Sequence, residues 1–449
     1  KDKDLSLITN KDRMEYVSKL GKVFEEYRST VYNKGFSGTE DISLNQISEF
    51  IFAINNDLET TISSSKNGNG LYHAYNTIQI DLKKQAMDVQ HLDLMLEGQV
   101  AALSSGVLKI DDAIEVLGIL SASELFRENM RSFMLYPIKK VTPFLEKNII
   151  QPHSISKSKL LSTMLRNNDF TLIEQDADDQ FRFRPQFRNS FDLQAALHQM
   201  LDKKDYKDLV ELENDLMLEI FEAVFDHRNY TGRSGTMFSY EGIGSIYWHM
   251  ISKLLLAVQE NYFKAVRTNV SSEKMKKLGQ LYYDIRGGLS AAKTPEEYGA
   301  FPYDPYSHTP AHSGAQQPGM TGQVKEEILT RFGELGCTVA HGCIRFEPYL
   351  LKRSEFLTTK QVFKYYDIFR QKRELIILEN QLAYTFCQVP VIYTLSDKDN
   401  HILLELSDGS KVELDGNVLD EKQSNPIFNR NGKIVKIEVF IQNNNLTIS

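Results

Sequence analysis

The sequence predicts a mainly helical region followed by a region of antiparallel β-strands. In residues 11–335, segment after segment carries apolar residues at helical spacing, with short polar or glycine-containing links between them. After Gly336 the chain changes to short runs rich in β-branched and aromatic residues. Asp408-Gly409 and Asn431-Gly432 are dipeptides typical of hairpin turns. Helix after helix with few strands is typical of an αα-hairpin bundle or an α/α toroid.

We therefore divide the chain into a helical domain, residues 1–336, and a C-terminal β-sandwich, residues 337–449. One strand-like patch, residues 170–187, interrupts the helices and predicts a β-hairpin. About nine helices are expected ahead of the β domain, at residues 12–32, 44–62, 92–103, 110–120, 157–165, 190–201, 205–225, 244–266 and 272–285. In the β domain, strands are expected at residues 338–346, 389–394, 401–406, 411–414 and 434–441, with a helix-like insertion near 359–373.

Composition excludes several classes of protein. The 449 residues are 41% hydrophobic and 25% charged, as in ordinary globular proteins. A net charge of −8 without a basic stripe argues against nucleic acid as a partner. The 3 cysteines cannot all pair, so we expect reduced thiols in a cytoplasmic protein. None has metal-ligand spacing with a histidine, so no metal site is expected.

The chain carries no signal of a membrane or of secretion. No run approaches the ~18 apolar residues of a membrane span. The first residues lack the apolar core of a signal peptide. They also lack an initiator Met, so we expect a processed chain or a piece of a longer one.

A long polar loop leads into a helix that opens at Thr321-Gly322. Compact domains rarely keep a loop as long as residues 296–320 without a use for it. A helix N-terminus has unpaired N–H groups and the positive end of a dipole, and so suits an anion such as phosphate. The plainer interpretation is that Thr321 is a simple N-cap.

A second polar segment surrounds Arg233-Ser234, between Gly232 and Gly235. Arg grips oxyanions with two hydrogen bonds, so we expect these two residues in an anion site. The alternative is a surface turn with a solvated Arg.

The next polar pair along the chain is Tyr240-Glu241. Glu241 suits a general base or a ligand of sugar hydroxyls, and the alternative is a carboxylate that stabilises a helix start.

The remaining candidates suit neutral sugar hydroxyls. They are His249, on an aromatic-rich helix, the loop residues His308, His312, Gln316 and Gln317, and a cluster of Tyr72, His73, Glu97 and Gln99. For His249 a satisfied core histidine is an equal alternative. The loop residues equally suit a polar surface, and ordinary packing is the simpler account of the cluster around Tyr72.

The order of these pieces resembles the second half of the catalytic module of inverting sugar phosphorylases of the cellobiose phosphorylase type (glycoside hydrolase family 94), and of the related β-1,3-glucan phosphorylases (family 149). The resemblance rests on Met320-Thr321-Gly322, on the stretches 332–336 and 342–348, on His73-Ala74-Tyr75 followed by residues 99–106, and on Gly235-Thr236-Met237-Phe238. It covers roughly residues 45–350, with sparse and gapped matches.

The resemblance implies an (α/α)6 barrel of the six-hairpin glycosidase kind and a glycosyltransferase-type phosphorolysis of a β-linked glucan or oligosaccharide. Phosphate would be the co-substrate, without another cofactor. Arg233, Ser234, His312, Thr321 and Gly322 would bind phosphate, and Tyr72, His73, Glu97, Gln99, Tyr240, His249, His308, Gln316 and Gln317 would bind sugar.

Two departures from the family pattern matter. The family's general acid is an Asp in a Trp-Asn-Asp-like motif, and this chain has a single Trp, Trp248, and no such motif. The family's phosphate-binding His is replaced here by the neighbourhood of Tyr240-Glu241. We therefore expect the N-terminal remainder of the enzyme or a second chain as a partner, and a homodimer is left open. An inverting hydrolase with Glu241 as base, and a non-catalytic carbohydrate-binding partner, are the alternatives.

Overall fold

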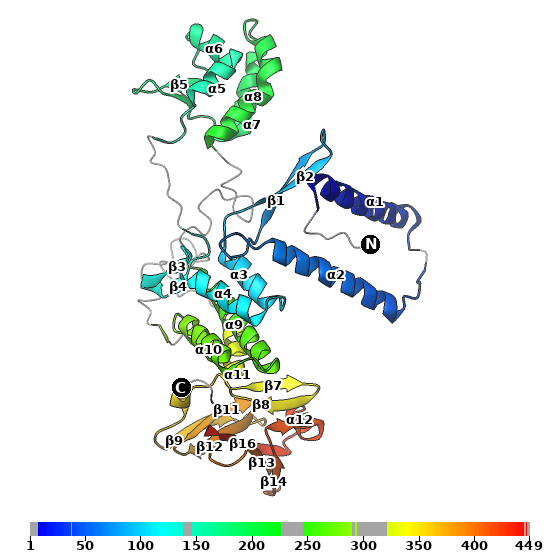
Figure 1. Ribbon diagram of the computed structural model, residues 1–449, viewed down its shortest axis with the longest axis vertical. Helices are drawn as coiled ribbons and strands as arrows, with labels where there is room; N and C mark the ends of the chain where they lie inside the picture. Colours follow the sequence, from blue (N-terminus) through cyan, green and yellow to red (C-terminus); the bar gives the residue numbers. More distant parts are fainter. Residues whose placement is uncertain are drawn as a thin grey trace. The chain divides into compact units, whose positions relative to one another are not determined.

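The computed structural model describes residues 8–36, 38–137, 146–225, 246–289, 292–293, 321–443 and 446, with only the backbone for 321–325. The chain forms two compact units, Lys1–Tyr136 with Ser245–Ser449, and Pro137–Gly244 (Figure 1). We call them the main unit and the inserted unit. The inserted unit was not predicted from the sequence. The predicted domain boundary at Gly336 stays a prediction.

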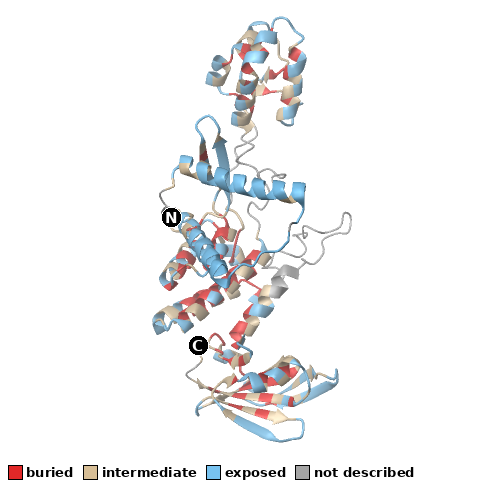
Figure 2. Ribbon diagram, turned by 90° about the vertical axis from the view of Figure 1, so that its right-hand side faces the viewer, coloured by how far each residue is buried: buried red, intermediate tan, exposed pale blue. Residues whose placement is uncertain are grey.

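The main unit begins with two long helices, α1 (Asn10–Lys34) and α2 (Leu44–Ser64), both as predicted. Each opens with a capping box, Thr9 with Asp12 and Ser43 with Gln46, which satisfies two N–H groups at each helix start. A hairpin of β1 (Asn76–Asp81) and β2 (Ala86–His91) follows. The sequence did not predict it, because the apolar alternation is short, with only Ile78 and Ile80 in β1 and Met87 and Val89 in β2, and most of the hairpin is exposed (Figure 2).

A helical core forms around α9. Helix α9 (Trp248–Arg267) packs against α3 (Leu96–Ser104), α10 (Ser272–Arg286) and α11 (Thr321–Glu334), and α4 (Ile110–Ser121) joins them. A short pair, β3 (Phe126–Arg127) and β4 (Ser132–Phe133), flanks the single turn η2 (Glu128–Met130). Fully buried side chains such as Leu254, Tyr262 and Tyr282 form the shared core. The predicted helices are confirmed, whereas their closure into an (α/α)6 barrel stays a prediction.

The inserted unit has a hydrophobic core of its own, around Leu160, Ile173 and Phe221. Its elements are α5 (Pro152–Lys157), α6 (Lys159–Arg166), β5 (Ile173–Gln175), β6 (Phe181–Phe183), α7 (Ser190–Met200) and α8 (Lys207–Phe225). Strands β5 and β6 pair antiparallel, which confirms the hairpin predicted in residues 170–187. The separate core explains why this segment forms a compact unit by itself.

The C-terminal part consists mainly of sheets, as predicted. The single strand expected at residues 338–346 is wrong, because this segment is a hairpin of β7 (Cys337–Ala340) and β8 (Cys343–Phe346) that turns at His341 and Gly342, both of positive φ. One sheet has the strand order β11-β12-β16-β13-β14, a second β15-β8-β7, and a hairpin joins β9 to β10. Pairing is antiparallel except between β12 and β16, which run parallel. The strands are β7 (Cys337–Ala340), β8 (Cys343–Phe346), β9 (Gln361–Tyr366), β10 (Lys372–Ile377), β11 (Gln381–Phe386), β12 (Val389–Ser396), β13 (His401–Leu406), β14 (Lys411–Asp415), β15 (Val418–Leu419) and β16 (Ile434–Gln442).

The helix-like insertion expected near residues 359–373 is wrong, because this segment is the β9–β10 hairpin. At its turn the Asp367 carboxylate accepts hydrogen bonds from the N–H groups of Phe369 and Gln371. Arg370 there has a positive φ of 60°, which a helix does not allow.

The turn signal at Asp408-Gly409 joins β13 to β14 as expected. That at Asn431-Gly432 instead joins the unpredicted helix α12 (Glu421–Phe428) to β16. A single turn, η6 (Arg353–Glu355), lies between β8 and β9. Among the described residues, no helix combines the length and the apolar character that crossing a membrane requires.

Candidate functional site

The predicted site residues divide into three groups. Thr321 and Gly322 open α11, as predicted, although their side chains are not described. Tyr72, His73, Glu97, Gln99 and His249 are fully described and lie in the main unit. Outside the described residues lie Arg233, Ser234, Tyr240, Glu241, His308, His312, Gln316 and Gln317.

Gln99 fixes the segment that carries Tyr72 and His73. Its side chain is completely buried, at 0% exposure. The amide Nε2 donates to the carbonyls of Tyr72 at 2.7 Å and Met95 at 2.9 Å, while Oε1 accepts from the N–H of Tyr72 at 2.9 Å. With both donors used and the side chain out of reach of solvent, this geometry favours a positioning role for Gln99.

Gly98 permits the close approach that this contact needs. A Cβ at this position would lie 2.6 Å from the carbonyl oxygen of Tyr72 and 3.2 Å from the N–H nitrogen of Ala74. Any side chain would push the 72–74 segment away from the first turn of α3. The Tyr72 ring packs into the helical core, and burial of the phenol raises the pKa of Tyr72.

A polar cluster forms next to this clamp. The Tyr75 hydroxyl donates to Glu97 Oε2 at 2.8 Å, at the start of α3. The His73 ring stacks on His91, with centroids 4.5 Å apart. Since His73 Nδ1 lies 2.9 Å from the carbonyl oxygen of Leu92, which can only accept, the hydrogen is on Nδ1 and a neutral His73 keeps Nε2 as an acceptor.

His91 is a member of this cluster that the sequence analysis missed. Its Nδ1 lies 2.6 Å from Oδ1 of Asn76, its cross-strand partner in the β1–β2 hairpin. Partial burial and the neighbouring His73 lower the pKa of His91. The cluster of His73, His91, Tyr75 and Glu97 thus offers hydroxyl, carboxylate and imidazole groups, a set suited to sugar hydroxyls. Without the register of the hairpin, nothing in the sequence places His91 beside His73.

The second described place is the start of α9, where His249 meets α11. His249 Nε2 lies 3.1 Å from Glu326 Oε1, and its Nδ1 lies 3.4 Å from the Tyr247 hydroxyl. Further along both helices, Gln259 Nε2 donates to the carbonyl of Thr330 at 2.8 Å. From the first contact to the second, both helices advance toward their C-termini, so α9 and α11 both start on the side of His249 and Glu326.

Each helix start on this side offers unpaired N–H groups and the positive end of a dipole, which suit an anion, and the Glu326 carboxylate lies between the two helices. His249 joins both helices, and Glu326 was not predicted. The Glu326 Oε2 atom is buried and has no hydrogen-bond partner among the described residues. One ring nitrogen of His249 lies next to the Tyr247 hydroxyl and the other next to Glu326, so His249 links the two helices. The predicted contact of His249 with sugar stays a prediction.

A network of charges around the buried Glu334 holds α11 in this position. Glu334 Oε1 accepts from the Tyr282 hydroxyl at 2.6 Å and from Arg286 Nε at 3.2 Å, and Glu334 Oε2 accepts from Arg331 at 2.7 Å. Arg331 also pairs with Glu355 at 2.6 Å. Two carboxylates face two guanidinium groups, so the network balances its own charge and ties α11 to α10 and η6.

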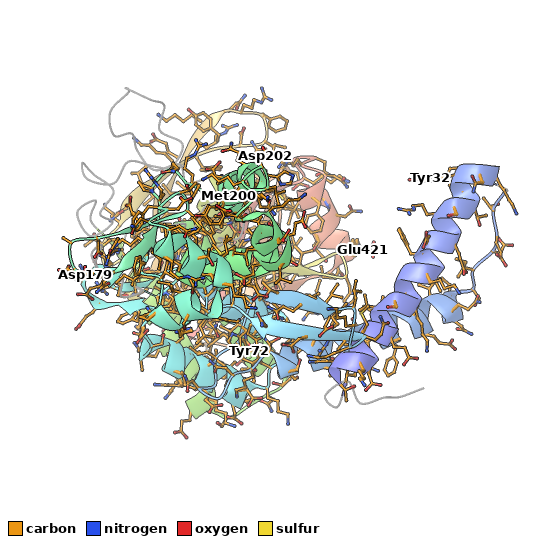
Figure 3. All side chains as sticks on the ribbon, turned by 90° about the horizontal axis from the view of Figure 1, so that it is seen from above. Tyr32, Tyr72, Asp179, Met200, Asp202 and Glu421 are labelled. Carbon is orange, nitrogen blue, oxygen red and sulfur yellow. The ribbon has the colours of Figure 1, made fainter. Side chains whose placement is uncertain are left out.

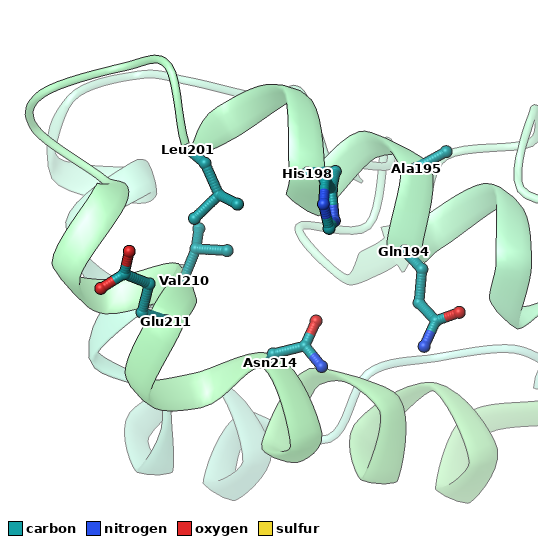
Figure 4. A pocket seen from close by; sticks show the side chains of 7 residues that line it. All are labelled: Gln194, Ala195, His198, Leu201, Val210, Glu211 and Asn214. Carbon is teal, nitrogen blue, oxygen red and sulfur yellow. The ribbon is translucent and has the colours of Figure 1, made fainter.

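The inserted unit contains a cavity of about 380 Å³ between α7 and α8. Figure 4 shows Gln194 and His198 of α7 facing Asn214 of α8. Leu201 and Val210 form its apolar end. Nothing in the sequence analysis pointed to this cavity.

The inserted unit is also where a comparison with known proteins gives a result. The family model described as GH149 phosphorylase insertion domain 2 matches residues 141–228. This match relates the chain to family 149 phosphorylases. It supports an enzyme of the glycoside phosphorylase kind, acting in carbohydrate metabolism. No curated protein matches the chain.

Proposed function

We propose that this chain is the phosphate-binding half of an inverting glycoside phosphorylase, which cleaves a β-linked glucan or oligosaccharide to a sugar 1-phosphate. The observation that carries the proposal is the match of residues 141–228 to an insertion domain of family 149 phosphorylases. The paired starts of α9 and α11 support it, because Thr321 opens α11 at an end suited to an anion.

The reaction would be a single displacement. Phosphate attacks the anomeric carbon while a carboxylic acid protonates the departing glycosidic oxygen. In this proposal the N–H groups of the α11 start, with Thr321 and Arg233, orient the phosphate and spread its charge. The cluster of His73, Tyr75 and Glu97 binds sugar hydroxyls. The general acid is supplied by the N-terminal remainder of the enzyme or by a second chain.

Two measurements on the purified chain test the proposal. Isothermal titration calorimetry with inorganic phosphate, against nitrate at equal ionic strength, should show phosphate-specific binding. Incubation with β-linked gluco-oligosaccharides and phosphate should yield no sugar 1-phosphate from this chain alone. Robust turnover by the chain alone would contradict the assignment to one half of the enzyme.

Two other outcomes would replace the proposal. Release of reducing sugar that does not depend on phosphate would indicate an inverting hydrolase. Binding of oligosaccharide without any binding of phosphate would indicate a non-catalytic carbohydrate-binding partner.

A further inference from the structure

Glu326 puts a carboxylate beside the helix start at which the proposed function, on which this inference rests, places phosphate. It lies in the second turn of α11, and side chains on a helix lean toward the N-terminus, so the carboxylate is directed toward the turn that Thr321 opens. An ionised carboxylate there repels phosphate, because both groups are negative. The site therefore needs a group that cancels the charge of Glu326.

The surroundings of Glu326 also favour a nearby positive charge. Its side chain is only 14% exposed. The Oε2 atom is buried and has no hydrogen-bond partner among the described residues. A carboxylate that has lost water without gaining a full set of hydrogen bonds is destabilised unless an opposite charge is close.

The His249 ring is placed to supply that charge. Its Nε2 atom lies 3.1 Å from Glu326 Oε1, and the His249 side chain is 26% exposed, so water screens the pair weakly. An ionised carboxylate can only accept hydrogen bonds, so this contact places a hydrogen on Nε2. A neutral His249 then has its lone pair on Nδ1, on the side of the Tyr247 hydroxyl.

The other titratable groups around His249 are suited less well to gain a proton near neutral pH. Tyr and Lys side chains ordinarily titrate near about pH 10 and Glu near about pH 4, whereas the ordinary range of imidazole includes neutral pH. The groups concerned are Tyr247 and Lys253 on either side of His249 in the chain, Glu327 on α11, and Lys293, whose ammonium lies 4.7 Å from the ring of Trp248.

We propose that binding of phosphate at the start of α11 is coupled to the uptake of one proton by His249, and that Glu326 is the positioning residue for this proton. Without phosphate, His249 is neutral and keeps its hydrogen on Nε2, next to Glu326. When phosphate binds, a proton from solvent adds to Nδ1, and the imidazolium cancels the charge of the carboxylate. The proton returns to solvent when phosphate leaves.

Calorimetry in buffers of different ionisation enthalpy, such as HEPES and Tris, counts the protons taken up with phosphate. The wild-type chain should take up close to one proton more than Glu326→Gln, which keeps an oxygen acceptor for Nε2–H and removes the charge. Comparison of two variants cancels the protons that phosphate itself carries. The matched control is Glu421→Gln, which removes a carboxylate from the exposed start of α12 (Figure 3) and should behave as wild type.

Phosphate affinities separate cancellation of charge from a purely structural link between the helices. The variant His249→Gln leaves the Glu326 carboxylate without its counter-charge and should weaken phosphate binding by about tenfold or more. The double variant His249→Gln/Glu326→Gln lacks both charges and should regain most of that loss. A structural link predicts the opposite, because the second substitution would weaken binding further.

The outcomes distinguish this inference from the proposed function. Equal proton uptake by wild type and Glu326→Gln would overturn the inference alone, as would a double variant that binds no better than His249→Gln. If the wild-type chain binds no phosphate while its circular dichroism spectrum shows folded helices, the inference and the proposed function both fail.

Discussion

Gln99 pairs with the backbone of Tyr72 on both sides, donating to its carbonyl at 2.7 Å and accepting from its N–H at 2.9 Å. A side-chain amide thus does for this segment what a neighbouring strand does in a sheet. The segment leads directly to His73 and Tyr75, which form the polar cluster with Glu97 and His91. The geometry of the cluster therefore depends on a buried amide that makes no contact with solvent.

The variant Gln99→Leu should destabilise the main unit strongly. It leaves the N–H and carbonyl of Tyr72 buried without partners, at about 1–3 kcal/mol each, so the expected loss is about 2–6 kcal/mol. Urea unfolding followed by the fluorescence of Trp248 measures it, because this single tryptophan packs against the same helical core. The control is Gln90→Leu, at an exposed position of β2, which should change stability by less than about 0.5 kcal/mol. Equal effects of the two substitutions would contradict a structural clamp.

The sequence predicts the long elements of this fold well and the short ones poorly. Helices α1, α2, α8, α9 and α10 have enough turns for their apolar spacing to be unambiguous, and the predicted bounds lie within a few residues of those observed. The helix expected in the β9–β10 segment is wrong because the apolar residues from Val362 to Phe369 fit both the helical and the strand period. The turn is decided by the Asp367 carboxylate and by Arg370.

The candidate site was predictable in its residue types but not in its contacts. The start of α11 at Thr321 follows from the sequence, because the apolar spacing begins there. The roles of Glu326 and His91 do not follow from the sequence. Glu326 contacts His249, which is 77 residues away. His91 stacks on His73, and the sequence does not give the register of the hairpin that brings them together. Contacts between distant segments require the packing of α9 on α11, which no local pattern specifies.

The Cys337 thiol should be unreactive in the folded protein. Its burial raises its pKa to about 12, so little thiolate forms near pH 8. A thiol reagent such as Ellman's should modify the partly exposed Cys343 and Cys387 first and Cys337 only in denaturant. Reaction of all three thiols at one rate in the native protein would show that Cys337 is accessible.

The same shift in pKa predicts a pH dependence of stability. The folded thiol has a pKa of about 12, above the ordinary value of 9.0. The contribution of the neutral thiol to the free energy of unfolding is therefore complete below about pH 9 and is lost as the pH rises towards 12. The advantage of wild type over Cys337→Val should therefore be constant from pH 6 to 8 and shrink above pH 9. Unfolding midpoints in urea measure it, and an advantage that grows with alkaline pH would contradict the assigned sign.

Arg233 and Thr321 should act on one phosphate, although Arg233 lies outside the described residues and their proximity stays a prediction. Each of Arg233→Ala and Thr321→Val should weaken phosphate binding, by about 10- to 100-fold for the Arg. Calorimetry measures the free energy of phosphate binding in each variant. The loss in the double variant should be smaller than the sum of the losses in the two single variants, because the second substitution removes a contact with a phosphate that is already weakly bound. Strictly additive losses would indicate two separate sites.

Glu241 separates phosphorolysis from hydrolysis. In a phosphorylase the phosphate is the nucleophile and no base is needed, so Glu241→Gln should weaken substrate binding and leave sugar release dependent on phosphate. In an inverting hydrolase a base must activate water, with its carboxyl roughly 6.5–9.5 Å from that of the acid, and the same change should abolish turnover with little effect on binding. Both rates are measured, with and without phosphate, on this chain combined with the proposed source of the general acid, an N-terminal remainder or a second chain. We expect the phosphorylase result, because the N–H groups at the start of α11 and the guanidinium of Arg233 favour an anionic nucleophile over water. Phosphate-independent hydrolysis that disappears in Glu241→Gln would overturn that choice.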